Sequence, residues 1–219
     1  MVKIVVNSFK EMFLSVFVLQ IQDKSILLVI YRTEGKQLPM EYVVLGLLLI
    51  RPRTIYEING WFKMSISLFY RASYGSLQIA VKKLLAKGYI DYKESTENGR
   101  HKKTYSITNA GTQAFFIWMH DEIPKNNLEV VGLSKLFFLG LLKDLDEREE
   151  VISKIRTGLK ETINELELVE KQIHSFEIPE SDKAVFYYQA KTLDYGIWTN
   201  KAALKWFKRL LSEMQQQSK

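Results

Sequence analysis

The stretch "ASYGSLQIAVKKLLAKGYIDYKESTENGRHKKTYSITNAG" at residues 72–111 decides the fold of this chain. It opens with a helix signal, because Ser73 or Ser76 is a favoured N-cap residue ahead of apolar side chains at helical spacing. Gly88 is suited to end this helix in a left-handed conformation. The apolar positions of the predicted helix are Leu77, Ala80, Val81, Leu84 and Leu85.

A β-hairpin with a basic tip is predicted to follow the helix. "YIDYKE" at 89–94 and "KTYSIT" at 103–108 are rich in Tyr, Ile and Thr, as strands are. "STENGRHK" joins them, and its Asn98–Gly99 pair favours a tight two-residue turn. Residues 72–111 carry seven Lys or Arg against three Asp or Glu, so the helix and hairpin together suit a polyanion.

The residues before and after this stretch complete a known order of elements. "EYVVLGLLLI" predicts a buried helix that Pro52 stops, and Thr54 with Glu57 forms a capping-box pattern for "IYEINGWFKM". Thr108 is placed to start another helix. The order helix, helix, helix, strand, strand, helix predicts a winged helix-turn-helix domain over residues 40–122, whose third helix faces a DNA groove.

The charge is concentrated in this domain. Residues 40–120 carry 11 Lys or Arg and 5 Asp or Glu, a net of +6, which equals the net charge of the whole chain. Residues 121–219 carry 15 and 17, a net of −2. This distribution predicts that a polyanion is held by the middle of the chain.

The rest of the chain is predicted to be helical. Apolar residues at spacings of three or four form a seam that suits a partner helix, although an intrachain bundle is the alternative. We therefore expect a mainly α fold, with a helical dimerisation domain at 128–214 after the winged domain. The expected seam residues are Ile152, Ile155, Leu159, Leu166 and Ile173.

Residues 1–39 are predicted to be an N-terminal extension with two short strands. Their apolar runs are shorter than the roughly 20 residues of a spanning helix, so no membrane partner is expected. An open alternative is that translation starts at Met40, because Glu34–Gly35 is compatible with a purine-rich ribosome-binding sequence. The chain has no cysteine, which fits a cytoplasmic location and excludes disulfides and thiolate sites.

Residues 73–111 resemble the PadR family of bacterial transcriptional regulators. The resemblance lies in "SYGSL", "KKLLAKGYI" and "GR-KK-YSIT-AG", together with the upstream "LGLLL" and "YEI". The last helix, "LDYGIWTNKAALKWFKRLL", is similar to that of the longer members, which have an AphA-like C-terminal domain. Two positions depart from the family pattern: Gln78–Ile79 replaces an aromatic–proline pair, and Thr54–Ile55 replaces His–Gly.

The resemblance implies a homodimer whose winged domains read a pseudo-palindrome in double-stranded DNA. It also implies repression that a small aromatic effector relieves. We expect DNA contacts on the third helix and the hairpin, against the alternative that these residues cap helices, pack in the core or are simply solvated. The predicted DNA-binding residues are Ser73, Tyr74, Ser76, Gln78, Lys82, Lys83, Arg100, His101, Lys102 and Lys103.

Aromatic residues provide a candidate effector cavity between the two domains, although filling of the core or the dimer seam is the alternative. No nucleophile motif, phosphate-binding loop or metal-ligand spacing is present, so we expect no enzyme, metal or cofactor. The function predicted is transcription regulation, and the alternative is a winged-helix protein-interaction module with a helical scaffold. The candidate effector residues are Phe115, Trp118, Tyr187, Tyr188 and Trp198.

Overall fold

The fold is taken from a computed structural model of the 219-residue chain, which describes residues 40–70, 72–97, 100–173 and 178–217. The strands expected within residues 1–39 lie outside these ranges. The chain divides into two compact units, with the division between Lys154 and Ile155. The unit before the division is called the winged unit below, and the unit after it the helical unit.

The first described helix, α3, spans Met40–Ile50 and is buried along most of its length. Its Val and Leu side chains form the centre of the winged unit, as the apolar run predicted. The helix ends two residues before Pro52, which has no backbone N–H to continue it.

Helix α4, Ile55–Met64, begins with the predicted capping box. The Thr54 backbone N–H donates to the Glu57 carboxylate at 2.6 Å, and the Glu57 N–H donates to the Thr54 hydroxyl at 3.3 Å. The pKa of Glu57 is held below its ordinary value, first by the hydrogen bond from the Thr54 backbone N–H and then by that from the Thr54 hydroxyl, which donates to the carboxylate at 2.8 Å. Such a cap stabilises a helix by about 1 kcal/mol.

Helix α5, Tyr74–Ala86, follows the short 3-10 helix η1, Ile66–Leu68. Of the two serines considered as its cap, Ser73 is the N-cap and Ser76 completes the capping box. The predicted apolar stripe is buried at Leu77, Ala80, Val81 and Leu84. Gly88 has a φ of 66°, which confirms the left-handed end of the helix.

The hairpin is longer than predicted. Strand β2 spans Ile90–Glu97 and β3 spans Arg100–Ile107, whereas the turn predicted at Asn98–Gly99 lies outside the described residues. The antiparallel register pairs Ile90 with Ile107 and Glu97 with Arg100. Six of the eight residues expected in the loop, 95–97 and 100–102, are therefore strand.

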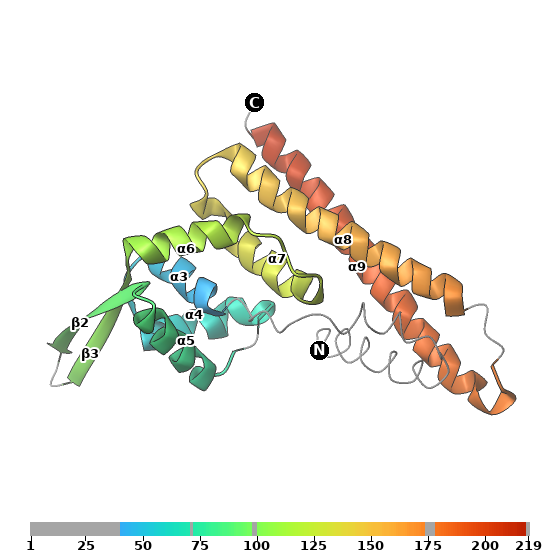
Figure 1. The fold of residues 1–219 in the computed structure, drawn as a ribbon, viewed down its shortest axis with the longest axis horizontal. Helices are drawn as coiled ribbons and strands as arrows, with labels where there is room; N and C mark the ends of the chain where they lie inside the picture. The colour runs from blue at the N-terminus through green and yellow to red at the C-terminus, as the bar shows by residue number, and fades with distance from the viewer. Residues whose placement is uncertain (1–39, 71, 98–99, 174–177, 218–219) are drawn as a thin grey trace. The chain divides into compact units, whose positions relative to one another are not determined.

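A third strand, β1 at Arg53–Thr54, was not predicted because two residues give no periodicity. It pairs with β3, so the antiparallel sheet has the order β1-β3-β2. The hairpin extends away from helices α3 to α6 (Figure 1). This arrangement of three helices and a three-stranded sheet is the predicted winged helix-turn-helix, within a mainly α fold.

Helix α6, Asn109–His120, packs on α3 and begins at the predicted cap Thr108, whose hydroxyl accepts from the Gly111 N–H at 3.1 Å. A Cβ atom on Gly111 would lie 2.0 Å from the Tyr89 carbonyl oxygen, so only glycine allows this approach of helix and hairpin. The 3-10 helix η2, Lys125–Asn127, then leads into α7, Leu128–Phe137.

Two lysines donate hydrogen bonds to carbonyl groups at the C-terminal end of α6. The ammonium of Lys135, a residue of α7 with 1% exposure, donates to the Asp121 carbonyl and lies 5.6 Å from the Trp118 ring centroid. The Lys154 ammonium donates to the His120 carbonyl at 2.5 Å. Cations at a helix C-terminus complement the carbonyl groups that have no partner within the helix.

The 3-10 helix η3, Leu139–Leu141, precedes α8, Leu145–Ile173, in which the division between the units falls. The helical unit continues with the 3-10 helix η4, Glu180–Asp182, and with α9, Lys183–Gln217, which runs beside α8 (Figure 1). The search for a membrane-spanning segment, made over the described residues, found no helix of sufficient length and apolar character. The hydrophobic cluster of the helical unit consists of Ile173, Leu193 and Ile197, with Leu166, Val169, Phe186 and Ala190 against it.

Candidate DNA interface

One face of α5 is polar and exposed. Tyr74, Gln78 and Lys82 are exposed, and they lie four residues apart, so they follow one line along the helix surface. The capping box occupies the two serines: the Ser73 N–H donates to the Ser76 hydroxyl at 3.0 Å, and the Ser76 N–H donates to the Ser73 hydroxyl at 3.1 Å. Tyr74, Gln78 and Lys82 are therefore the side chains of α5 that are best placed to meet a ligand.

The two neighbouring lysines of α5 have different surroundings. Lys83 lies 3.8 Å from the largely buried carboxylate of Glu41 in α3, which also accepts a hydrogen bond of 2.5 Å from Lys87. This hydrogen bond to Glu41 is the largest cause that raises the pKa of Lys87. Lys82 is exposed, and no ion pair joins it to another described residue. Of the pair, Lys82 is the lysine that is available to a phosphate.

The hairpin carries its cations on both faces. His101 and Lys103 alternate with Lys102 along β3, so Lys102 points to the opposite face, and all three are exposed. Lys102 is near enough to Glu57 of α4 to contribute to the lowered pKa of that carboxyl group. The side chain of Arg100, the fourth predicted contact of the hairpin, lies outside the part that the structure describes.

Lys103 is held within the hairpin. Its ammonium lies 3.1 Å from the Glu94 carboxylate and 4.3 Å from the centroid of the Tyr92 ring. The pKa of Lys103 is raised, first by the hydrogen bond with Glu94 and then by that with Tyr92. Both ends of the ion pair are about half-exposed, so it stabilises the hairpin little.

Sequence reasoning overlooked Tyr56 of α4 as a site residue. The ring of Tyr56 is 76% exposed, and it stacks on the ring of Tyr74 with centroids 6.3 Å apart and planes at 26°. Its position gave a signal, because Tyr56 falls outside the apolar face of Ile55, Ile58 and Phe62. An aromatic ring exposed on the helix before α5 was therefore visible in the sequence.

The predicted effector residues fall into two groups. Phe115 and Trp118 are buried in the core of the winged unit, with Phe115 5.7 Å from the ring of Phe138 and Trp118 stacked on Tyr42 at 5.1 Å. For these two residues the structure supports the alternative that they fill the core. The other three, Tyr187, Tyr188 and Trp198, are exposed on α9 in the helical unit.

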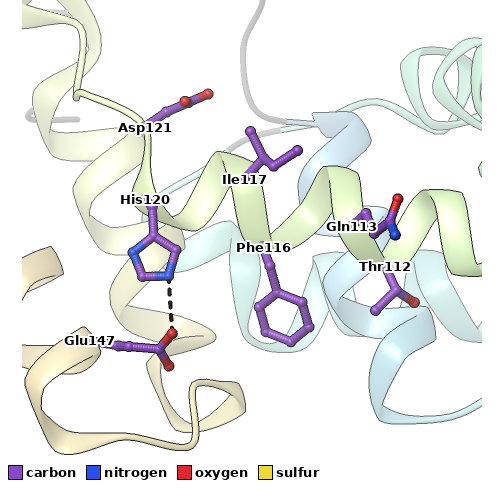
Figure 2. A pocket seen from close by; sticks show the side chains of 7 residues that line it. All are labelled: Thr112, Gln113, Phe116, Ile117, His120, Asp121 and Glu147. Carbon is purple, nitrogen blue, oxygen red and sulfur yellow. Dashed lines mark ion pairs between the residues drawn. The ribbon is translucent and has the colours of Figure 1, made fainter.

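A hollow of about 630 Å³ lies along α6 in the winged unit (Figure 2). Phe116 and Ile117 supply its apolar lining, and the Nε2 atom of His120 in α6 lies 3.6 Å from the Glu147 carboxylate of α8. The second ring nitrogen of His120 lies 3.5 Å from Glu150. The remaining lining residues are Thr112, Gln113 and Asp121.

Four of the five residues of the predicted dimer seam are buried within the single chain, and Leu166 is partly buried. Ile152 and Ile155 are nearly inaccessible, and Leu159 is buried as well. Leu166 and Ile173 contact α9 in the hydrophobic cluster of the helical unit. For Leu166 and Ile173 these contacts support the intrachain alternative, and contact of the seam with a second copy stays a prediction.

A search of the described residues for three or more grouped His, Cys, Asp or Glu side chains that could hold a metal ion found none. The surface of the winged unit has a polar face of α5 beside a basic hairpin. This arrangement suits binding of a polyanion.

Comparison with known proteins matches part of the winged unit to a family model. Residues 44–116 match the family model of the "Transcriptional regulator PadR-like family". A curated relative, the "Negative transcriptional regulator PadR" of Bacillus subtilis (strain 168), is 28% identical over 106 residues. That match covers 47% of this chain and 58% of the relative, so it spans little more than half of the relative's length.

Two solved structures are similar over most of their length. The chain of Bacillus subtilis PadR in complex with operator DNA is 21% identical, with a TM-score of 0.40, and the match covers 82% of this chain and 99% of that chain. The PadR-like regulator BC1756 of Bacillus cereus is 23% identical, with a TM-score of 0.39, and the match covers 83% and 99%.

Proposed function

Because residues 44–116 form a domain of the PadR-like family of transcriptional regulators, we propose that this chain binds double-stranded DNA sequence-specifically and regulates transcription. The observation that carries the proposal is the surface of the winged unit. There α5 exposes Gln78 and Lys82 while the adjacent hairpin exposes His101 and Lys102. A polar recognition helix beside a cationic hairpin has the two parts that groove reading and backbone binding require.

In this mechanism α5 enters the major groove with its N-terminal half toward the base edges. The carboxamide of Gln78 is suited to two hydrogen bonds with an adenine, to N6 and N7. Lys82 and the hairpin cations contact phosphates, which fixes the register of the helix without reading sequence. Ser73 and Ser76 hold the first turn of α5 in place through their capping box.

The protein acts as a homodimer in this proposal. Tyr187, Tyr188 and Trp198 are exposed on α9, and such large apolar side chains are typical of residues that a partner covers. A dimer would present two copies of α5 to half-sites about 34 Å apart on one face of the duplex.

We further propose that the protein represses transcription and that a small aromatic effector relieves the repression. The proposed location is the cytoplasm. The curated relative is a negative regulator by name, which favours repression. The hollow along α6 has Phe116 and Ile117 in its lining and suits a small molecule with a ring. An effector acts by favouring a dimer whose recognition helices no longer match the half-sites.

A gel-shift titration tests DNA binding directly. Full-length protein is titrated into a duplex from the promoter of its own gene at several salt concentrations. We expect tight binding at low salt that weakens by orders of magnitude over a few-fold rise in salt, because each bound phosphate releases counterions. The absence of binding to that duplex and to unrelated duplexes at low salt would refute the proposed function.

A further inference from the structure

Tyr56 and Tyr74 form a stacked aromatic pair at the surface of the winged unit. Tyr56 lies in the first turn of α4 and Tyr74 is the first residue of α5. Tyr74 is 37% exposed, about half as much as Tyr56 at 76%. The pair therefore joins the beginnings of the two helices of the helix-turn-helix, with the Tyr56 ring on the outside.

The core does not account for the position of Tyr56. The apolar contacts of α4 are made by Ile58 and Phe62, which are buried, while Tyr56 points to solvent. A phenol that is exposed to this degree gives little stability through burial. Its ring nevertheless stacks on that of Tyr74, which favours one position of its hydroxyl.

The exposed hydroxyl of Tyr56 is available to a ligand. The Tyr56 side chain is 76% exposed, and a phenol hydroxyl can donate one hydrogen bond. Partial burial is the largest cause that raises the pKa of the neighbouring Tyr74 phenol, and Tyr56 contributes to the same shift. Both phenols are therefore protonated, neutral groups near neutral pH.

The place of the pair in the fold indicates the acceptor. When the second helix of a helix-turn-helix enters the major groove, the first helix crosses the DNA backbone. Tyr56 belongs to that first helix and stacks on a residue of the second. Tyrosine hydroxyls are among the neutral groups that bind phosphate oxygens in protein–DNA complexes.

We propose that Tyr56 donates its hydroxyl to a DNA phosphate and that Tyr74 positions it through the stacked ring. The inference rests on the proposed function and adds a contact to it of a different chemical kind. Lysine contacts replace condensed counterions on the DNA, whereas a neutral phenol replaces only water. The Tyr56 contact therefore adds affinity that does not depend on salt.

The test compares Tyr56→Phe with wild type in binding to a fluorescently labelled promoter duplex across a series of salt concentrations. Phenylalanine keeps the stacked ring and removes only the hydroxyl. We expect affinity to fall about tenfold, as for the loss of a hydrogen bond to a charged group. The slope of log affinity against log salt should stay as in wild type, because no cationic contact is lost.

Tyr195→Phe is the matched control, because Tyr195 is also an exposed tyrosine that stacks on an aromatic ring, but it lies in the helical unit. Its affinity should equal that of wild type. Equal affinities of Tyr56→Phe and wild type would overturn the inference, and so would a weaker variant with a shallower salt slope. If wild type itself binds no duplex, the proposed function fails. This outcome is distinguishable from failure of the Tyr56 inference alone, in which wild type binds the duplex.

Discussion

The winged unit and the helical unit differ in the size of their cores. In the winged unit Phe115, Phe138 and Met119 are almost inaccessible to solvent, although Tyr56 is 76% exposed at its surface. In the helical unit the cluster between α8 and α9 is small, while Tyr188 is 71% exposed and Trp198 is 66% exposed. The winged unit therefore has an extensive core beneath its exposed side chains, whereas the helical unit leaves several aromatic rings of α9 exposed around a small one.

This difference supports the proposal that a second copy covers the exposed rings of the helical unit. Exposed apolar patches on a folded protein mark surfaces that another molecule covers, whereas a closed core needs none. The winged unit also carries the basic surface, so the two roles that we propose are placed in different parts of the chain. The winged unit would bind DNA, and α9 would bring two copies together.

The largest effect is expected from a variant that creates a cavity in the core of the winged unit. Phe115→Ala should lower the free energy of unfolding by about 3–5 kcal/mol, because it removes a buried ring between Trp118 and Phe138. Urea denaturation followed by tryptophan fluorescence measures this loss. Tyr188→Ala, at an exposed position, should change stability by less than about 0.5 kcal/mol. Similar losses for the two variants would contradict the division into a closed and an open unit.

The winged core also contains a buried charge that should make its stability depend on pH. Burial lowers the pKa of Lys135 to about 8 from the ordinary 10.5. Between these pH values the unfolded chain binds more protons than the folded chain, so stability should rise with pH. The gain is at most about 3.5 kcal/mol, since each unit of pKa difference corresponds to about 1.4 kcal/mol.

Urea denaturation at pH 8 and pH 10 measures this gain. Lys135→Met keeps most of the buried side chain and cannot titrate, so its stability should change less over the same interval. An identical pH dependence in wild type and Lys135→Met would show that the lysine stays protonated in the fold.

Self-association should respond to the exposed rings of α9. Trp198→Ala is expected to weaken the dimer by about 2 kcal/mol, the cost of removing a central aromatic anchor. Sedimentation velocity over a concentration series measures the dissociation constant. Lys191→Ala is the control, because Lys191 forms an exposed ion pair with Asp194 that adds little. An unchanged dimer in Trp198→Ala would place self-association on another surface.

The smallest expected effect is a difference in the salt dependence of DNA binding between variants of two adjacent lysines of α5. Lys82→Ala should reduce the slope of log affinity for DNA against log salt by about 2 for the homodimer, because one phosphate contact is lost in each subunit. Lys83→Ala should leave the slope almost unchanged, since Lys83 faces Glu41. A larger change for Lys83 than for Lys82 would reverse the assignment of the two side chains.

Local signals in the sequence predicted the fold of the winged unit well. The capping box of Thr54 and Glu57 and the left-handed Gly88 are both confirmed, because each depends on residues that are close in sequence. The extension of the hairpin was underestimated, since the strand pattern of residues 95–97 and 100–102 is polar on both faces. Pairing beside a two-residue turn does not require apolar side chains.

The site was less predictable because it depends on contacts that are distant in sequence. Nothing near Lys83 indicates that Glu41, 42 positions earlier in the sequence, lies beside it. Similarly, Phe115 and Trp198 look alike as aromatic residues on apolar helix faces, yet one is buried and the other exposed. Composition and periodicity identify apolar faces but do not tell which face a second element covers.

Hydrogen exchange of the full-length protein, with and without a duplex from its own promoter, tests the division of roles most directly. We predict that DNA slows amide exchange in α5 and in the hairpin β2–β3, while exchange in α9 stays the same. Protection confined to α9, with α5 and the hairpin unchanged, would contradict the placement of DNA binding on the winged unit.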